Sequence, residues 1–181
     1  MNRRDFLKLG AASSAALTAT AFTATLTGCA ETLPANSQWK VLREKDRILL
    51  AAIAPVMLKG SLPEDAQARQ QGINIMLKNM DIGISKLGPY NTKQISDLFT
   101  LLNFGLSRGL TTGVWSKWEN ASENEIDNFL NRWRDSSVSL FNMGFNGLNK
   151  LMCATWFGQP AAWQNVGYPG PLYPDVLITK S

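Results

Sequence analysis

The chain has 181 residues, a length typical of one domain, and its 18 Lys and Arg against 14 Asp and Glu give a formal net charge of +4. This charge is too small to indicate a protein that reads nucleic acid. Because the chain contains no histidine, it lacks the commonest general base and metal ligand, and it cannot form a Ser-His-Asp or Cys-His catalytic unit. Apolar residues make up 45% of the chain and charged residues 18%, which favours a packed globular domain.

Residues 1–28 have the pattern of an export signal. Two adjacent arginines precede a Phe-Leu-Lys sequence, and a weakly apolar stretch rich in Ala, Ser and Thr follows. This pattern resembles a twin-arginine signal, an address for the export of folded proteins to the periplasm. The alternative is a membrane anchor, since Leu9 to Gly28 has about the 20 residues that a bilayer requires, but its Ala and Thr content makes insertion marginal. The predicted signal residues are Arg3, Arg4, Phe6, Leu7 and Lys8.

The signal ends in Leu26-Thr27-Gly28-Cys29, which resembles the lipobox of bacterial lipoproteins. We therefore expect lipid on the thiol of Cys29, which would become the first residue and hold the protein at a membrane. The alternative is an ordinary peptidase site that leaves a free thiol. Residues 29–38 are then a tether, and Cys153, left without a disulfide partner, is expected to be a small buried apolar residue on a helix.

Residues 39–158 show apolar residues at helical spacing, and we expect a helical domain there. The first helix begins near Leu42 and ends between Ala54 and Leu58. The second begins at Ser61-Leu62-Pro63-Glu64, where Ser61 would be the cap, and ends at Gly88-Pro89. Thr92 is predicted to cap a third helix that ends around Arg108-Gly109. The apolar positions of these helices are Leu49, Ala52, Ile53 and Val56, then Ile73, Met76, Leu77, Met80, Ile84 and Leu87, then Ile95, Leu98, Phe99, Leu102 and Leu106.

Two further helices are predicted in the second half of the chain. Ser122 and Glu125 have the spacing of a capping box, before a helix that carries Ile126, Phe129, Leu130 and Trp133 on one face. The fifth helix carries Phe141, Phe145, Leu148, Met152 and Trp156. No segment alternates with period 2 as a strand does. We therefore predict an all-α, single-domain bundle of about five helices, followed by an extended segment over residues 159–181.

No catalytic, cofactor-binding or metal site is expected in this chain. It has no Gly-rich phosphate loop after a strand, no Cys-x-x-Cys-His and no cysteine cluster. Its paired carboxylates fall at predicted helix starts, where acidic residues cap N–H groups: Glu64, Asp65, Glu119, Glu123, Glu125 and Asp127. Arg132 and Arg134 flank Trp133, so we expect both to point away from the apolar face, toward solvent or a partner.

The C-terminal segment is rich in proline and large aromatic residues. Proline restricts the backbone, and this lowers the entropy cost when neighbouring Trp and Tyr side chains dock on another surface. We therefore predict that this segment binds a partner protein, and the alternative is that it packs on its own domain. The predicted contact residues are Trp163, Tyr168, Pro169, Pro171 and Tyr173.

Several short motifs resemble the small subunit of bacterial periplasmic flavin dehydrogenases, the gluconate 2-dehydrogenase subunit 3-like group. They are the twin-arginine start, Trp39, Leu106-Ser107-Arg108-Gly109 with Thr112 to Trp118, Phe129-Leu130 with Trp133-Arg134-Asp135-Ser136, and Trp163 with Gly167-Tyr168-Pro169-Gly170-Pro171. The resemblance implies a non-catalytic subunit of a large flavoprotein (FAD) of the glucose-methanol-choline type, often with a cytochrome c subunit. In that family the large subunit commonly leaves the cytoplasm with the small one. The lipobox is less typical of the group.

Two other functions remain open at the level of sequence. One is a small enzyme that uses Asp, Glu or Tyr as its acid and base, and the other is an independent periplasmic structural lipoprotein without a dehydrogenase partner. A neighbouring gene for a flavoprotein without a signal would favour the accessory subunit over the independent lipoprotein.

Overall fold

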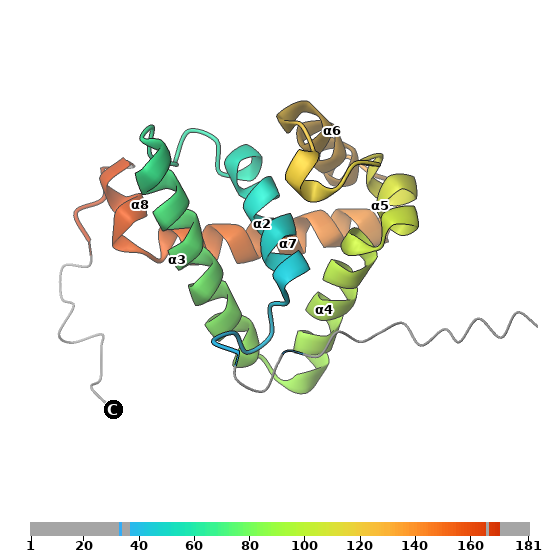
Figure 1. The fold of residues 1–181 in the computed structure, drawn as a ribbon, viewed down its shortest axis with the longest axis horizontal. Helices are drawn as coiled ribbons and strands as arrows, with labels where there is room; N and C mark the ends of the chain where they lie inside the picture. Colours follow the sequence, from blue (N-terminus) through green and yellow to red (C-terminus); the bar gives the residue numbers. More distant parts are fainter. Residues whose placement is uncertain (1–32, 34–36, 166, 171–181) are drawn as a thin grey trace, which may run out of the picture. The chain divides into compact units, whose positions relative to one another are not determined.

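The structure is a computed structural model that describes residues 33, 37–165 and 167–170, all of which belong to one compact unit, Thr32–Ser181. The predicted signal, Cys29, Pro171 and Tyr173 lie outside the described residues. The described part of the chain is all-α, as predicted, and contains no strand. Its elements are α2 (Glu44–Met57), α3 (Ala66–Ser85), α4 (Pro89–Asn103), α5 (Gly105–Thr112), the 3₁₀ turn η1 (Trp118–Asn120), α6 (Glu123–Arg134), α7 (Ser139–Phe157) and α8 (Pro160–Asn165) (Figure 1).

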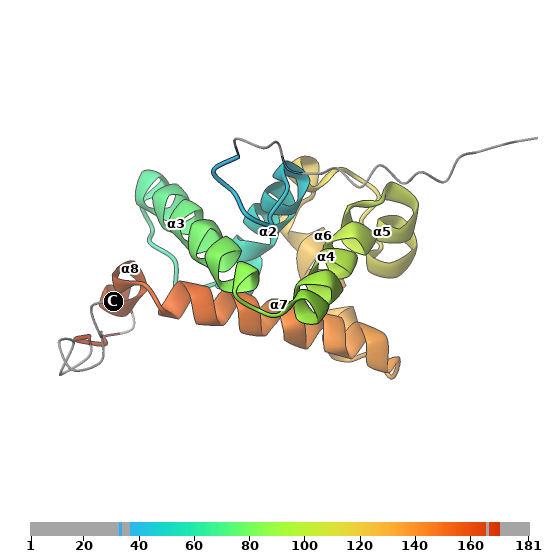
Figure 2. The same ribbon diagram turned by 90° about the horizontal axis from the view of Figure 1, so that it is seen from below.

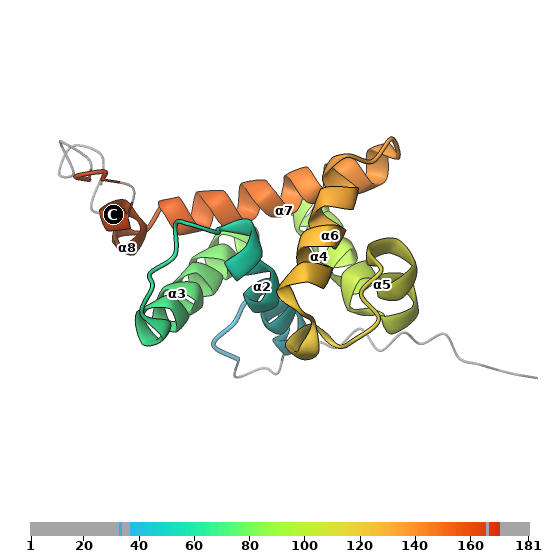
Figure 3. The same cartoon turned by 90° about the horizontal axis from the view of Figure 1, so that it is seen from above.

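Helix α2 lies at the centre of the packing and contacts α3, α4, α6, α7 and η1. Helix α7 runs along one side of α3, α2 and α6, as Figures 2 and 3 show from opposite sides. The core between them contains most of the predicted apolar positions, because each stripe at helical spacing faces α2 or α7. Fully buried members are Leu49, Ile53, Met76, Met80, Ile84, Phe129, Leu148, Met152 and Trp156.

Local capping explains where two of these helices begin. The predicted capping box of α6 is present, because the Ser122 hydroxyl accepts from the Glu125 N–H at 3.3 Å and the Glu125 carboxylate accepts from the Ser122 N–H at 2.9 Å. The hydrogen bond from the Ser122 backbone lowers the pKa of Glu125. Helix α3 begins later than predicted, because Asp65 rather than Ser61 is its cap and accepts from the Ala68 N–H at 2.7 Å.

The predicted third helix is two helices. Helix α4 starts at Pro89, so Thr92 lies inside its first turns, and the Thr92 hydroxyl donates instead to the carbonyls of Ile84 and Leu87 at the end of α3. Phe104 adopts an extended conformation (ψ 118°) that separates α4 from α5. Leu106, expected in the core, is consequently an exposed residue of α5.

The extended segment predicted from residue 159 is wrong for residues 160–165, which form α8. Pro160 begins this helix, a position where its missing N–H has no helical partner. Gln159 comes just before it and is buried, and its side-chain amide donates to the Gly72 carbonyl of α3 at 3.4 Å.

A buried carboxylate fixes the chain where it enters the domain. Asp81 of α3 is 2% exposed, and its two oxygens accept hydrogen bonds of 2.8 Å from the backbone N–H groups of Lys40, Val41 and Leu42. Hydrogen bonds to a charged acceptor are stronger than neutral ones. This carboxylate therefore holds residues 40–42 against α3 and so fixes the position at which α2 begins.

Replacing Asp81 by Asn removes the charge and turns an amide N–H₂ toward the same donors. We expect the free energy of unfolding to fall by about 2 kcal/mol, measured by urea denaturation. The control is Asp97→Asn, which breaks an exposed ion pair with Lys93 (2.6 Å) and should cost below about 0.5 kcal/mol. Equal effects of the two substitutions would contradict the role of Asp81.

Two glycines of α7 provide a matched test of packing against Trp133. A Cβ at Gly144 would lie 2.5 Å from the Trp133 ring, whereas one at Gly147 would meet nothing within 4 Å. Gly144→Ala should destabilise the protein by roughly 1–3 kcal/mol, because Trp133 is buried and cannot move freely. Gly147→Ala should be neutral or stabilise by about 0.5 kcal/mol. Thermal unfolding of both variants measures the difference, and equal melting temperatures would rule out this packing constraint.

Candidate functional site

The C-terminal aromatic residues form a small cluster at the end of α7. The Trp163 indole N–H donates to the Phe157 carbonyl at 2.8 Å, and the Tyr168 ring meets Trp163 edge-on with centroids 5.5 Å apart. Gly170 has a positive φ (+96°), and a Cβ there would lie 3.1 Å from the Trp163 ring. Trp163 is partly buried against its own core, whereas Tyr168 and Pro169 are exposed.

The predicted partner-binding residues that the structure describes therefore fall into two groups. Trp163 makes the intramolecular contacts that were the alternative for this segment, and Tyr168 and Pro169 present surface that a partner could contact. Pro171 and Tyr173 lie outside the described residues.

A larger apolar surface lies between α4 and α7. Helix α4 packs on α2 and α5, while α7 packs on α3 and α6, and between α4 and α7 is a groove with a volume of about 640 Å³. Figure 2 shows α4 beside the N-terminal half of α7. The groove is lined by Leu87, Asn91, Gln94, Ile95, Asp97, Leu98, Leu101, Trp133, Leu140, Met143, Gly144 and Gly147.

The side chains on the α7 wall explain why the groove is open. Leu140 and Met143 are 61% and 62% exposed, and Gly147 carries no side chain to fill the space beside it, while the Trp133 ring lies over Gly144. Sequence analysis missed this surface because it selected the stripe that begins at Phe141. The positions 140, 143, 144 and 147 form a second stripe at i, i+3, i+4 and i+7, and that spacing could have revealed it.

A second apolar patch covers α5. Phe104, Leu106, Leu110 and Trp115 are each more than half exposed. The Trp115 ring lies on Gly109, where a Cβ would come within 2.4 Å of it. Exposed apolar side chains that gather in this way are typical of interaction surfaces.

Side chains of α5 and α6 hold the turn that follows α5. Arg108 donates to the carbonyls of Val114 (3.2 Å) and Trp115 (3.3 Å), and the Trp133 indole N–H donates to the Thr111 carbonyl at 2.9 Å. Arg132 was predicted to point toward solvent or a partner, but it donates to the Thr112 carbonyl. Arg132 is nevertheless exposed and lies off the apolar face as predicted, and its contact with Thr112 supplies a donor to one of the last carbonyls of α5.

Arg134 is also exposed, as predicted. It pairs with Asp135 at 2.9 Å, and this hydrogen bond lowers the pKa of the Asp135 carboxyl. Cys153 is partly buried on α7 as a member of the apolar cluster, and burial raises the pKa of its thiol.

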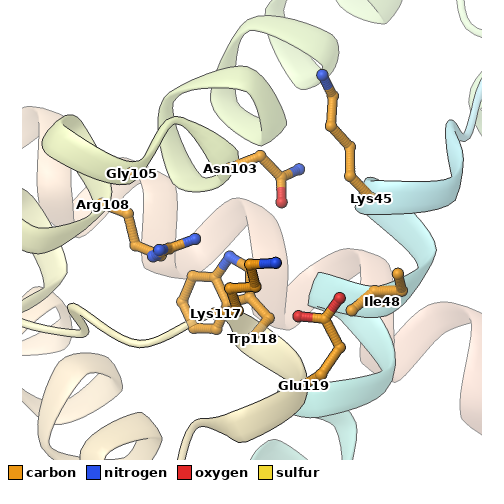
Figure 4. A pocket seen from close by; sticks show the side chains of 8 residues that line it. All are labelled: Lys45, Ile48, Asn103, Gly105, Arg108, Lys117, Trp118 and Glu119. Atoms are coloured by element: carbon orange, nitrogen blue, oxygen red, sulfur yellow. The ribbon is translucent and has the colours of Figure 1, made fainter.

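A polar pocket of about 350 Å³ lies between α2, the start of α5 and η1. Figure 4 shows the side chains of Arg108, Lys117 and Glu119 directed into it, and the Asn103 side-chain oxygen faces the same space. The amino group of Lys45, which also lines the pocket, points away from its middle. Ile48 and Trp118 supply apolar wall.

The part of the chain that the structure describes contains no group of three or more Cys, Asp or Glu side chains that could hold a metal ion. None of the described helices has both the length and the apolar character that a membrane span requires.

Comparisons with known proteins identify no relative of this chain. The sequence matches no protein-family model, and neither the curated proteins nor the solved structures include a significant match.

Proposed function

We propose that this protein is a non-catalytic accessory subunit that binds a flavin-dependent sugar or alcohol dehydrogenase, accompanies it through twin-arginine export, and stabilises it or tethers it to a membrane through lipid on Cys29. The observation that carries the proposal is the apolar groove between α4 and α7. An exposed groove of this size costs solubility in a free protein and is typical of an interaction site.

The charge and geometry of the groove favour a protein partner. Its walls are mainly aliphatic, and its polar lining residues are two amides and Asp97, whose carboxylate already pairs with Lys93. Such a surface binds by burying apolar side chains of a partner in a central, water-excluded region. The exposed patch on α5 and the exposed Tyr168 and Pro169 extend the surface that is open to a partner.

The N-terminal sequence supports the export part of the proposal. A signal of the twin-arginine type suits cargo that has already folded around its cofactor, and a flavoprotein without its own signal is such a cargo. In the proposed assembly, FAD belongs to the large subunit, substrate is chosen there, and a cytochrome c subunit could accept the electrons. The competing proposal is an independent periplasmic lipoprotein, which predicts that no flavoprotein depends on this chain.

A charge placed in the groove tests the docking surface. Met143→Lys should reduce the flavoprotein recovered with the tagged chain from its native host by at least about tenfold, because a buried, unpaired ammonium costs more than the roughly 1.4 kcal/mol that a tenfold change represents. Recovery is measured by flavin absorbance and by identification of the bound protein.

Ile75→Lys is the matched control, since Ile75 is 48% exposed on α3 and does not line the groove. Tyr168→Ala tests the C-terminal cluster with little risk to folding, whereas replacing Trp163 would also disturb its own domain. Equal recovery of the flavoprotein with Met143→Lys and with the unchanged chain would exclude the groove as the docking site. The absence of any flavoprotein with the unchanged chain would reject the proposed function.

A further inference from the structure

The pocket between α2, α5 and η1 contains a buried cation that the described residues leave without a counter-ion. Arg108 is 8% exposed, yet none of the ion pairs in the described part of the chain includes it. Its charge is offset by the carbonyls of Val114 and Trp115 and by the ring of Trp118, whose centroid is 5.9 Å from the guanidinium carbon. Carbonyl dipoles compensate a buried charge only in part, and buried charges in proteins are normally paired.

The Arg108 guanidinium also has N–H donors that make no hydrogen bond to the described residues. An arginine side chain carries five N–H donors in a planar fork, and Arg108 uses one from Nε and one from Nη2 on these carbonyls. Three donors therefore remain, on a side chain that is directed into the pocket (Figure 4). A planar fork of this kind matches the two oxygens of a carboxylate.

The other side chains of the pocket set the charge that an occupant should have. Lys117 is exposed and is in none of the ion pairs of the described residues, and Glu119 faces the same space. The charged side chains directed into the pocket, Arg108, Lys117 and Glu119, together give a net charge of +1, while the amino group of Lys45 points away from its middle. This charge suits a single negative charge better than a dianion.

We propose that this pocket binds the carboxylate of a small organic monoanion, held by the free edge of Arg108 and attracted by Lys117. The volume of about 350 Å³ lies at the low end of the range for small-molecule sites. The carboxylate would lie against Arg108, the Asn103 side-chain oxygen could accept from a hydroxyl of the same molecule, and Ile48 would contact its carbon skeleton. The site is separate from the groove between α4 and α7, so it does not depend on the proposed function.

The test is a titration of the purified full chain followed by the NMR signals of the Arg108 Nε–H and the Trp118 indole N–H. The probes are sodium acetate, sodium benzoate and sodium phosphate, compared with sodium chloride at equal ionic strength. We expect saturable shifts of both signals with acetate and with benzoate, weaker shifts with phosphate, and no shift of the Trp163 indole signal.

Variants at the rim keep the test independent of folding, because Arg108 also holds backbone carbonyls and its removal would disturb the turn. Lys117→Gln should weaken benzoate binding by about threefold and Glu119→Gln should strengthen it by about threefold, the effect of one charge at a solvent-exposed site. Lys150→Gln, on the exposed face of α7, should leave the affinity unchanged.

The proposal is overturned if the carboxylates give no saturable shift, or if chloride gives the same shifts. It is also overturned if phosphate binds more tightly than both carboxylates, since the site would then prefer a different oxyanion. Equal affinities of the chain, Lys117→Gln and Glu119→Gln would likewise exclude this pocket as the site of binding.

Discussion

The turn after α5 is the constraint on which both candidate sites depend. Helix α5 ends at Thr112, and the next residue, Gly113, has a φ of +76° that reverses the chain, so the last carbonyls of the helix have no helical N–H to accept from. Arg132 and Trp133 of α6 donate to two of them, and Arg108 donates to two carbonyls of the turn itself. These bonds join α5 to α6 and fix two side chains that also line candidate sites, Trp133 and Arg108.

Trp133 and Arg108 connect the turn to the two candidate sites. Trp133 is buried between the turn and α7, where its ring forms part of the lining of the apolar groove. Arg108 passes from α5 toward η1 and lines the polar pocket. The motifs that suggested the flavin dehydrogenase small subunit, Arg108-Gly109, Thr112 to Trp118 and Trp133-Arg134, lie in this same region. In the structure they hold the backbone together, which gives a physical reason for their residue types that does not depend on the family.

Sequence periodicity predicted the helices well and the surfaces poorly. The stripe of α6 and the positions 148, 152 and 156 of α7 are buried as expected, because apolar spacing is set by the core that those residues enter. The break at Phe104 could not be predicted in this way, since the apolar spacing continues through it and only the local backbone changes. Arg132 is exposed as predicted, but its hydrogen bond could not be predicted for a related reason, since the carbonyl that it binds is 20 residues away in sequence. The groove could not be predicted from the sequence either, because its open space comes from Gly147 and from the way α4 packs on its other neighbours.

In the proposed function, export of the flavoprotein depends on its association with this chain. This helical domain would then use a pathway for folded cargo because it carries a folded partner, a flavoprotein that lacks a signal. The most direct measurement is the distribution of that flavoprotein between cytoplasm and periplasm when Arg3 and Arg4 are both replaced by Lys. The account predicts that FAD-containing dehydrogenase then remains in the cytoplasm together with this chain. Normal amounts of active dehydrogenase in the periplasm, with this chain retained inside the cell, would contradict it.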